Sequence, residues 1–430
     1  MTNKKSLKTI VVYTRAPWEN ALVKLRITAP AELAGINVLN GKEGGTYHPQ
    51  LVTQADIVVI QRDFPLHWKA YKNVLDIAIT NNKPVIYEMD DLLLDMPNDH
   101  SHRHEYVRAL LPMLDAALRS DVVTVSTRLL AEYIGRWNPN TRIIPNYLDD
   151  HIWDFKKVDE KLGNTDTLVI GYMGGETHLL DLKYISEALI KVINKYAGRV
   201  RLRIWGGKPP DVLVTSSYCE WLPINQLNYA LFAKFFSQQD CDIFIAPLRD
   251  NRFNRSKSEI KFLEYGVHGV PGIYSQLPPY EAIVIHGQNG YLASTIDEWE
   301  ESLVKLIENP ELRQKMGSEA QITVKDGWLL SQNNQGWLEA YQSALNPKAE
   351  EEQVDPGLIN LLSVIQQSIE YNNELLESVS ALTEQVEDIL GSRSWRMMKK
   401  FQNIRLKLIP PGGSGERMLN SVLGKSFPKS

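Results

Sequence analysis

Cysteine is scarce in this 430-residue chain, and long apolar runs are missing. The two cysteines, Cys219 and Cys241, form neither a disulfide framework nor the Cys-x-x-Cys spacing of a metal site, so we expect core residues of a reduced protein. No stretch approaches the roughly 18 consecutive apolar residues of a membrane span, and no apolar segment of signal-peptide length follows the basic N-terminal residues. These absences argue against an integral membrane protein and predict a cytoplasmic one.

An excess of one charge is also missing, because the formal net charge is only −5 with 23 % charged residues. Such a chain has no general attraction for nucleic acid, so we expect no nucleic-acid partner, and any basic site must be a local cluster. A chain of 430 residues exceeds what one hydrophobic core serves, which favours two domains and an appendage.

Short β-branched runs alternate with helical periodicity along most of the chain. The predicted strands lie in two sets, first "KTIVVYT", "GINVLN", "ADIVVIQR", "KPVIYEM", "DVVTVST" and "TRIIPN", then "TLVIGYMGG", "RVRLRIWGG", "CDIFIAPL" and "VPGIYS". This alternation predicts an α/β fold with two Rossmann-like doubly wound domains, each built on a parallel sheet.

Composition changes divide the chain further, and a C-terminal helix follows the two domains. From Leu375, apolar residues recur in steps of four and three, which predicts a coiled-coil helix that pairs with a partner. The predicted parts are an N-terminal domain over 1–153, a linker over 154–167, a second domain over 168–325, closing helices over 326–346, a coiled coil over 355–390 and a basic amphipathic tail over 391–430.

The stretch "NRSKSEIKFLEYGVHGVP", residues 254–271, crowds positive charge around a predicted helix start. Ser256 and Glu259 have the spacing of a capping box, which predicts that the helix begins at Lys257. Four polar residues then share one helical stripe, separate from the apolar face: Lys257, Lys261, Glu264 and His268.

An anion at this helix start would meet free backbone amides and two lysines together. A diphosphate fits Lys257 and Lys261, and Glu264, two turns further on, could accept hydrogen bonds from the hydroxyls of a ribose. The alternative is a solvated surface stripe in which Lys261 pairs with Glu264.

Two further clusters follow predicted strands. Gly174 and Gly175 form either a simple tight turn or a loop whose amides approach a phosphate, with His178 and Asp181 close behind.

In the first domain, carboxylates and imidazoles lie close together in sequence. This cluster is either a metal site or a helix cap beside an ordinary surface loop. Its residues are Glu88, Asp90, Asp91, His100, His102 and His104.

The 254–271 stretch resembles the donor-site segment of retaining GT-B glycosyltransferases of glycosyltransferase family 4. It resembles the variant common in bacterial polysaccharide clusters, which reads Asn-x-x-Lys-Ser-x-x-Lys-x-x-Glu-Tyr. In that family the glutamate matching Glu264 holds the ribose, and a second glutamate stands where this chain has Ser256. "LVIGYMGGETHLLDL", "YEMDD" and "VKLRITAPAELAG" are similar to other segments of the same enzymes.

The residue pattern and this resemblance together assign roles to three groups of residues. The expected catalytic residues are Lys257, Lys261, Glu264 and His100. The expected donor-binding residues are Gly174, Gly175, His178, Asp181, Asn254, Ser256 and Ser258. The expected acceptor or cleft residues are Arg26, Asp90 and Asp91.

The resemblance implies a glycosyltransferase that moves a sugar from a nucleotide diphosphate donor to a glycan or lipid-linked acceptor in bacterial surface polysaccharide biosynthesis. It implies retention of configuration and no metal or other cofactor. Two alternatives stay open: a sugar-nucleotide epimerase of the same architecture, and a non-catalytic coiled-coil scaffold whose donor site is degenerate at Ser256.

The tail is strongly basic over 391–410 and carries apolar residues at helical spacing. Its Ser-x-Ser-Trp-Arg element resembles tails of bacterial polysaccharide-cluster enzymes, which favours contact with an anionic membrane surface at the inner face of the cell membrane. The alternative is an oligomerisation helix with a solvated basic face. We expect homo-oligomers through 355–390.

Overall fold

The computed structural model describes residues 7–157, 167–224, 228–346, 356–409 and 411–423. They divide into two compact units, one up to Ile359 and one from Asn360. None of the helices in these ranges is long and apolar enough to cross a membrane.

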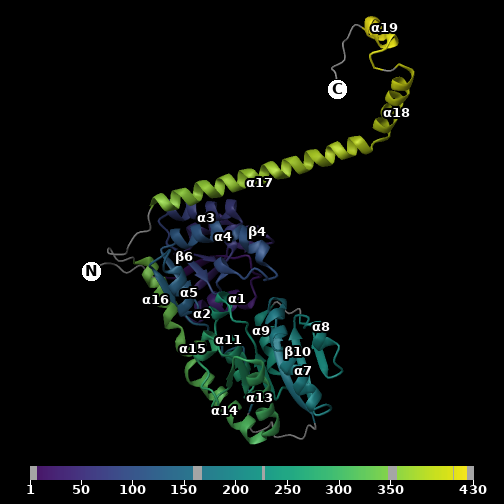
Figure 1. Cartoon of the computed structure of the whole chain (residues 1–430). Coiled ribbons are helices and arrows are strands. Elements are labelled where there is room, and N and C mark those ends of the chain that lie inside the picture. The colour runs from purple at the N-terminus through teal and green to yellow at the C-terminus, as the bar shows by residue number, and fades with distance from the viewer. Residues whose placement is uncertain (1–6, 158–166, 225–227, 347–355, 410, 424–430) are drawn as a thin grey trace. The chain divides into compact units, whose positions relative to one another are not determined.

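The first half of the larger unit is a six-stranded parallel sheet in the order β2-β1-β5-β6-β7-β8 (Figure 1). The six strands predicted here are confirmed: β1 (Thr9–Tyr13), β2 (Asn37–Asn40), β5 (Ile57–Gln61), β6 (Val85–Met89), β7 (Val122–Val125) and β8 (Thr141–Ile143). The sequence reading missed a small hairpin, β3 (Lys42–Glu43) and β4 (Thr46–Tyr47).

Helices cover both faces of this sheet because alternate residues of each central strand point to opposite sides. Val11 and Tyr13 of β1 belong to one apolar cluster, Ile10 and Val12 to another. The connecting elements are α1 (Ala21–Val23), the π-helical η1 (Lys24–Thr28), α2 (Ala29–Leu33), η2 (Pro49–Gln54), η3 (Phe64–Leu66), α3 (Trp68–Thr80), η4 (Leu93–Asp95), α4 (Arg103–Arg119) and α5 (Arg128–Ile134).

The second half holds another parallel sheet, in the order β11-β10-β9-β12-β13-β14. This is the doubly wound order 3-2-1-4-5-6, which places a crevice at the carboxyl ends of β9 and β12. Its strands are β9 (Leu168–Gly174), β10 (Val200–Gly206), β11 (Cys219–Leu222), β12 (Ile243–Ala246), β13 (Gly272–Ser275) and β14 (Tyr291–Ala293). The sequence reading missed β11 and β14.

Short and long helices alternate with these strands. They are η6 (Glu176–His178), α6 (Leu179–Tyr184), α7 (Ser186–Lys195), α8 (Asp211–Val214), α9 (Tyr229–Ser237), α10 (Arg252–Arg255), α11 (Ile260–Gly266), α12 (Pro278–Glu281), α13 (Ile296–Glu308), α14 (Pro310–Gly327), α15 (Leu330–Asn333) and α16 (Gln335–Leu345). From α16 the buried Trp337 and Tyr341 return to the first sheet, where they join the cluster of Ile10 and Val12.

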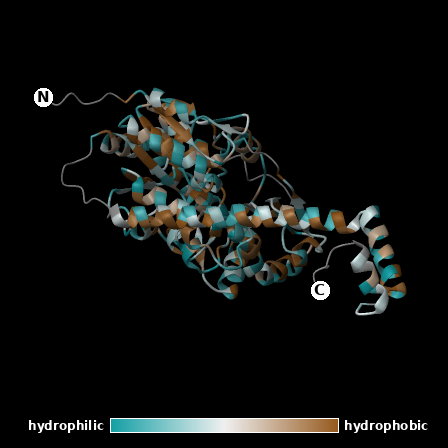
Figure 2. Ribbon diagram, turned by 90° about the horizontal axis from the view of Figure 1, so that it is seen from above, coloured by the Kyte–Doolittle hydropathy of each residue, from teal (hydrophilic) through white to brown (hydrophobic). Residues whose placement is uncertain are grey.

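The smaller unit, over its described residues 360–409 and 411–423, has helices as its only secondary structure. Most of α17 (Pro356–Gly391) belongs to it, followed by α18 (Arg393–Leu408) and α19 (Ser414–Leu423). Ser392 separates α17 from α18, and its side chain accepts a hydrogen bond from the Trp395 amide. Apolar residues recur along α17, as Figure 2 shows. The fold class is confirmed: two doubly wound α/β sheets with a helical C-terminal region.

Candidate functional site

The helix expected to begin at Lys257 begins three residues later, so this prediction is wrong. Ser256 does not form a capping box with Glu259, because it closes the preceding short helix α10. Its hydroxyl donates to the Arg252 carbonyl at 2.9 Å, and Glu259 takes the position before α11. The attraction for an anion at Lys257 would therefore have to come mainly from cationic side chains rather than from the end of this seven-residue helix.

The alternative of a solvated surface stripe along this helix is also wrong, because α11 is buried on all sides. Lys261 is 8 % exposed, Glu264 5 % and His268 0 %. The Lys261 ammonium donates to the Met173 carbonyl and lies 5.1 Å from the centre of the Tyr172 ring.

Burial also changes the ionisation of this pair. Burial and the neighbouring Lys257 charge lower the pKa of Lys261 to about 8. Burial raises the pKa of Glu264 to about 7, although Lys261 and a 3.1 Å hydrogen bond from the Tyr229 hydroxyl favour the carboxylate. Lys261 and Glu264 thus fix α11 against β9 and α9.

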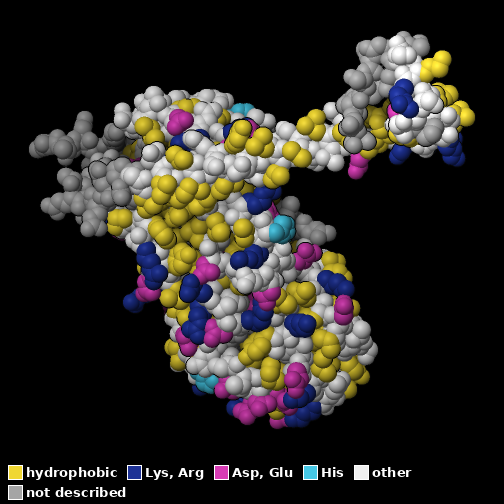
Figure 3. Space-filling view, turned by 45° about the horizontal axis from the view of Figure 1, so that its top comes forward, with side chains coloured by type: hydrophobic (Ala, Val, Ile, Leu, Met, Phe, Trp, Pro, Cys, Tyr) yellow, Lys and Arg dark blue, Asp and Glu magenta, His cyan; other side chains and the backbone are white. Residues whose placement is uncertain are grey.

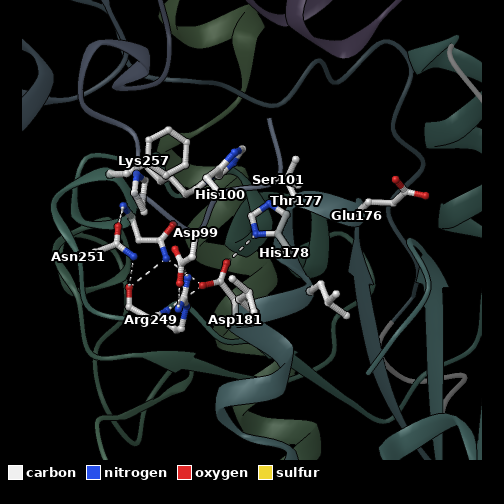
Figure 4. A pocket seen from close by; sticks show the side chains of 15 residues that line it. Asp99, His100, Ser101, Glu176, Thr177, His178, Asp181, Arg249, Asn251 and Lys257 are labelled. Carbon is white, nitrogen blue, oxygen red and sulfur yellow. Dashed lines mark hydrogen bonds and ion pairs between the residues drawn. The ribbon is translucent and has the colours of Figure 1, made fainter. Parts of the chain in front are cut away.

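Five of the predicted site residues line one cavity of about 190 Å³ between the two halves of the larger unit (Figure 4). They are His100 from the loop before α4, His178 from the β9–α6 connection, Asp181 from the first turn of α6, and Asn254 and Lys257 from the β12–α11 connection. Typical small-molecule sites have about 300–1,000 Å³, so this cavity suits part of a nucleotide sugar rather than the whole.

Asp181 organises the floor of the cavity. It is 4 % exposed, and its Oδ1 accepts hydrogen bonds from the Arg249 amide at 2.9 Å and the Asn254 side chain at 2.8 Å. Its Oδ2 lies 3.0 Å from Nδ1 of His178. Although burial alone would raise the pKa of Asp181, these contacts and nearby His178 outweigh it, so the pKa is lowered and the group stays a carboxylate. Asp181 therefore positions His178 and Asn254.

Lys257 is one of two basic residues that line the cavity, beside the acidic Asp99, Glu176 and Asp181. Among the described residues no carboxylate lies within 4.0 Å of its ammonium group, which sits 4.7 Å from the centre of the Phe253 ring. Burial and the Lys257 charge lower the pKa of His178 to about 4, and the same two causes lower the pKa of His100. Both imidazoles are therefore neutral at physiological pH, beside a cation.

A second cation, Arg249, closes one side of the cavity and was missed by the sequence reading. Its guanidinium reaches across to the first half of the unit, where it makes two hydrogen bonds to Asp99 at 2.8 and 3.2 Å. The Arg249 bond is the largest cause of the lowered pKa of Asp99. Both residues line the cavity. Arg249 directly follows the "IAPL" run of β12, and only the fold brings it to Asp99.

The structure places Arg26 away from this cavity, which corrects its expected cleft role. Arg26 is 1 % exposed, and its Nε donates to Glu88 at 2.7 Å. Its Nη1 donates to the Ile144 carbonyl and the Asn146 side chain, and the Trp337 indole donates to its backbone carbonyl at 2.7 Å. Arg26 is a structural residue that fastens β6, the chain after β8 and α16 together.

The two aspartates after β6 differ from each other. Asp90 is buried and ion-paired with Arg62, so it too is structural rather than cleft-facing. Asp91 lies 3.4 Å from Arg62 and is 25 % exposed at its side chain. Burial alone would raise the pKa of Asp91, but Lys257 and Arg62 together lower it, which places its charge near the cavity.

The carboxylates proposed as metal ligands are already occupied. Glu88 and Asp90 bind Arg26 and Arg62, which leaves little free carboxylate for an ion. In the part of the chain that the structure describes, the one group with ligand atoms close enough for a shared ion lies elsewhere, at Asp149, Asp150 and His151.

The remaining predicted residues support the site without lining it. The Ser258 hydroxyl oxygen accepts a hydrogen bond from Asn146 at 2.8 Å, and the Ser256 carbonyl accepts one from Thr127 at 2.9 Å, so both serines hold the two halves together. Gly174 accepts a hydrogen bond from the Gly207 amide at 2.8 Å, and a Cβ at Gly175 would meet open space.

Residues 167–309 match a protein-family model described as Glycosyl transferases group 1. The matched range runs from just before β9 to just after α13 and includes Lys257, His178 and Asp181. None of the curated proteins compared with the chain matches it.

Solved structures share the fold at low sequence identity. Anabaena Alr3699/HepE in complex with UDP-glucose has a TM-score of 0.55 at 15 % identity, over 79 % of this chain and 100 % of that chain. Sucrose-phosphate synthase from Thermosynechococcus elongatus has a TM-score of 0.56 at 12 % identity, with 79 % and 100 % covered. A glycosyltransferase from Rickettsia africae has a TM-score of 0.54 at 12 % identity, with 80 % and 100 % covered. The predicted GT-B fold class is thus confirmed.

Proposed function

We propose that this chain is a glycosyltransferase that moves a sugar from a nucleotide diphosphate donor to a glycan or lipid-linked acceptor in bacterial surface polysaccharide assembly. The observation that carries the proposal is Lys257, a cation without a carboxylate partner among the described residues, in a cavity between the two sheets. The match of 167–309 to Glycosyl transferases group 1 and a fold shared with HepE, solved with UDP-glucose, support it.

The proposed chemistry is electrostatic. When the bond between the sugar and the diphosphate breaks, negative charge grows on the leaving phosphate, and Lys257 stabilises that charge. Arg249 becomes a second phosphate ligand once the phosphate replaces Asp99 as its partner. With two cations at the phosphates, the scheme needs no metal or other cofactor.

His178 and His100 take the sugar side of the cavity. Because the Asp181 carboxylate binds Nδ1–H of the neutral His178 ring, Nε2 carries the lone pair and accepts a hydrogen bond from a sugar hydroxyl. We propose retention of configuration: the acceptor hydroxyl attacks from the face that the phosphate leaves, and the departing phosphate takes its proton.

Glu264 is proposed to bind the ribose. Its carboxylate already accepts a hydrogen bond from the Tyr229 hydroxyl, so a ribose hydroxyl would have to replace that donor and open the buried contact of α11 with α9.

Calorimetric titration with UDP, GDP and TDP tests the donor site. We expect one of them to bind, and Lys257→Met to weaken that binding by about 10- to 100-fold, since a hydrogen bond to a charged group contributes about 1.5–3 kcal/mol. Lys305→Met, at an exposed lysine of α13 that pairs with Glu301, is the matched control and should bind as the wild type does. The proposal fails if no diphosphate binds or if Lys257→Met binds with unchanged affinity.

Incubation with the matching nucleotide sugar then tests the reaction. A glycosyltransferase releases nucleoside diphosphate when an acceptor glycan is added, whereas an epimerase makes an isomeric nucleotide sugar from the donor alone. No release with any donor and acceptor, despite tight diphosphate binding, would favour the scaffold alternative.

We further propose that α18 brings the enzyme to the anionic inner face of the cell membrane, near a lipid-linked acceptor. The helix has six basic and no acidic residues and exposes Met397, Phe401 and Leu408. The full chain should sediment with vesicles of phosphatidylglycerol and phosphatidylcholine but not of phosphatidylcholine alone. Lys399→Gln/Lys400→Gln should weaken that sedimentation; equal sedimentation with both vesicles would refute an electrostatic surface.

A further inference from the structure

The exposed apolar residues of α17 form a regular heptad seam. In the letters abcdefg, the d positions are Leu361, Ser368, Leu375, Leu382 and Ile389, and the a positions are Ile365, Asn372, Val379 and Val386. The last five apolar members of this seam are 45–60 % exposed. Apolar surface recurs along α17 in the space-filling view (Figure 3). A seam of this kind is completed by another helix.

The residue types of the seam select one arrangement. β-Branched residues at a with leucine at d favour two parallel strands, and Val379 and Val386 alternate with Leu375 and Leu382 in this way. Asn372 occupies an a position, where a single polar residue fixes register and strand number at some cost in stability. In a parallel, in-register pair, Asn372 meets the Asn372 of a second copy, so each amide finds a hydrogen-bonding partner.

The charges of α17 are compatible with a second copy of itself. The helix carries six acidic residues and no lysine or arginine. Two copies would repel each other if these carboxylates faced the seam. All six lie at the outward b, c and f positions: Glu370, Glu374, Glu377, Glu384, Glu387 and Asp388. The flanking e and g positions from Ile369 to Leu390 carry no charge. These e and g positions therefore offer no charge with which a different, oppositely charged partner helix could form ion pairs.

We infer that α17 forms a parallel two-stranded coiled coil with α17 of a second copy of this chain, held in register by Asn372. A consequence concerns α18, which follows each α17 directly. If the two α17 helices are parallel, both α18 helices lie at the same end of the coiled coil. If they were antiparallel, the two α18 helices would lie at opposite ends. The inference does not depend on the proposed glycosyltransferase function.

Sedimentation velocity of the full chain tests the strand number. We expect a dimer at micromolar concentration, twice the chain mass of 49.0 kDa. Leu375→Glu/Leu382→Glu should convert it to a monomer, because two carboxylates then lie in the seam. The matched control Ser380→Glu/Ala381→Glu adds the same charge at b and c positions and should stay dimeric. A monomeric wild type, or a trimer or tetramer, overturns the inference.

Disulfide trapping tests the orientation, with Cys219 replaced by serine throughout. Ile389→Cys, at a d position near the end of the helix, should cross-link under mild oxidation, and Glu384→Cys at an outward f position should not. An antiparallel pair centred on the helix would hold the two residues at position 389 roughly 45 Å apart at 1.5 Å per residue. A dimer in which Ile389→Cys fails to cross-link is therefore not parallel.

Asn372→Val tests the register. The variant should resist urea better than the wild type but sediment as a mixture of dimers and larger species, because the residue that restricts strand number is gone. A variant that stays purely dimeric at unchanged stability would show that Asn372 lies outside the seam.

Discussion

His178 links the electrostatics of the cavity to the stability of the fold. Burial of its ring and the nearby Lys257 cation hold its pKa at about 4 instead of about 6.5, although the hydrogen bond with Asp181 acts in the opposite direction. The folded protein therefore keeps the ring neutral where the unfolded chain would protonate it. Below pH 6.5 the unfolded chain binds the extra proton, so the free energy of unfolding falls as the pH falls towards 4.

Replacing His178 by asparagine should remove this pH dependence while keeping a donor for Asp181. Between pH 7 and pH 4.5 the wild type should lose about 2 kcal/mol more stability than His178→Asn, as measured by urea unfolding at both pH values. His104→Asn, at an exposed histidine in the first turn of α4, serves as the control and should follow the wild type. Parallel losses in wild type and His178→Asn would show that the ring is not held neutral by the fold.

Removal of Arg26 would leave the Glu88 carboxylate buried without its main cation. Burial already raises the pKa of Glu88 to about 7 with Arg26 present. Arg26→Met should cost about 3–5 kcal/mol, as expected for breaking a buried ion pair. The native variant must then keep a proton on Glu88, so its stability should fall further as the pH rises from 6 to 8.5.

The double variant Arg26→Met/Glu88→Gln removes the carboxylate as well and should lose that pH slope in the same urea experiment. If single and double variants show equal stability at pH 8.5, the lost packing around Trp337 accounts for the cost and the charge does not.

The loops that follow β9 and β10 both contain glycine, and they approach each other closely. A Cβ at Gly207 would lie 2.6 Å from the Glu176 amide nitrogen and 2.7 Å from the Gly175 carbonyl carbon, both backbone atoms. Gly207→Ala should therefore push the β9–η6 loop away, with a cost of about 1–3 kcal/mol for overpacking, read as a lower Tm.

Gly175→Ala is the matched control, because its Cβ would enter open space at a φ of −75°. It should leave the Tm unchanged. It should also weaken diphosphate binding if the amides of this loop meet the phosphate. A Gly207→Ala protein with wild-type Tm would mean that the two loops are not in contact in solution.

The elements that sequence could predict are those whose pattern is local. The buried β-branched strands of both sheets were found, whereas β11 and β14 have three or four residues and little alternation. Lys257 was found because basic residues crowd the start of a predicted helix, whereas His178, Asp181 and Asn254 were found through the resemblance to the glycosyltransferase segments.

The missed features depend on tertiary packing. Burial of α11 on all sides follows from contacts with β9, α9 and α14, so helical periodicity alone left a solvated stripe open for Lys261 and Glu264. The structural role of Arg26 depends on Glu88, on the chain after β8 and on the return of α16 to the first sheet, all of which are distant in sequence. The Arg249 to Asp99 pair joins residues 150 positions apart and has no signal in either segment.

Among the described residues, two ion pairs join the halves of the larger unit. They differ in whether they line the cavity. Arg249 pairs with Asp99 and both line the cavity, while Arg252 pairs with Asp95 at 2.5 Å outside its lining. If the proposed donor site is right, a diphosphate entering the cavity would compete with Asp99 for Arg249 and leave the other pair intact. The first pair would then act against donor binding, whereas the second only holds the halves together.

Asp99→Asn should consequently tighten binding of the nucleoside diphosphate identified by calorimetry, by about 1.5- to 5-fold, because a partly exposed ion pair contributes about 0.2–1 kcal/mol. The gain should shrink at 0.5 M salt, where exposed charges are screened. Asp95→Asn removes the same charge from the neighbouring pair and should leave the affinity within error of the wild type. Equal effects of the two variants would show that the higher diphosphate affinity comes from a weaker contact between the two halves. Weaker binding in Asp99→Asn would mean that Asp99 orients Arg249 for the phosphate instead of competing with it.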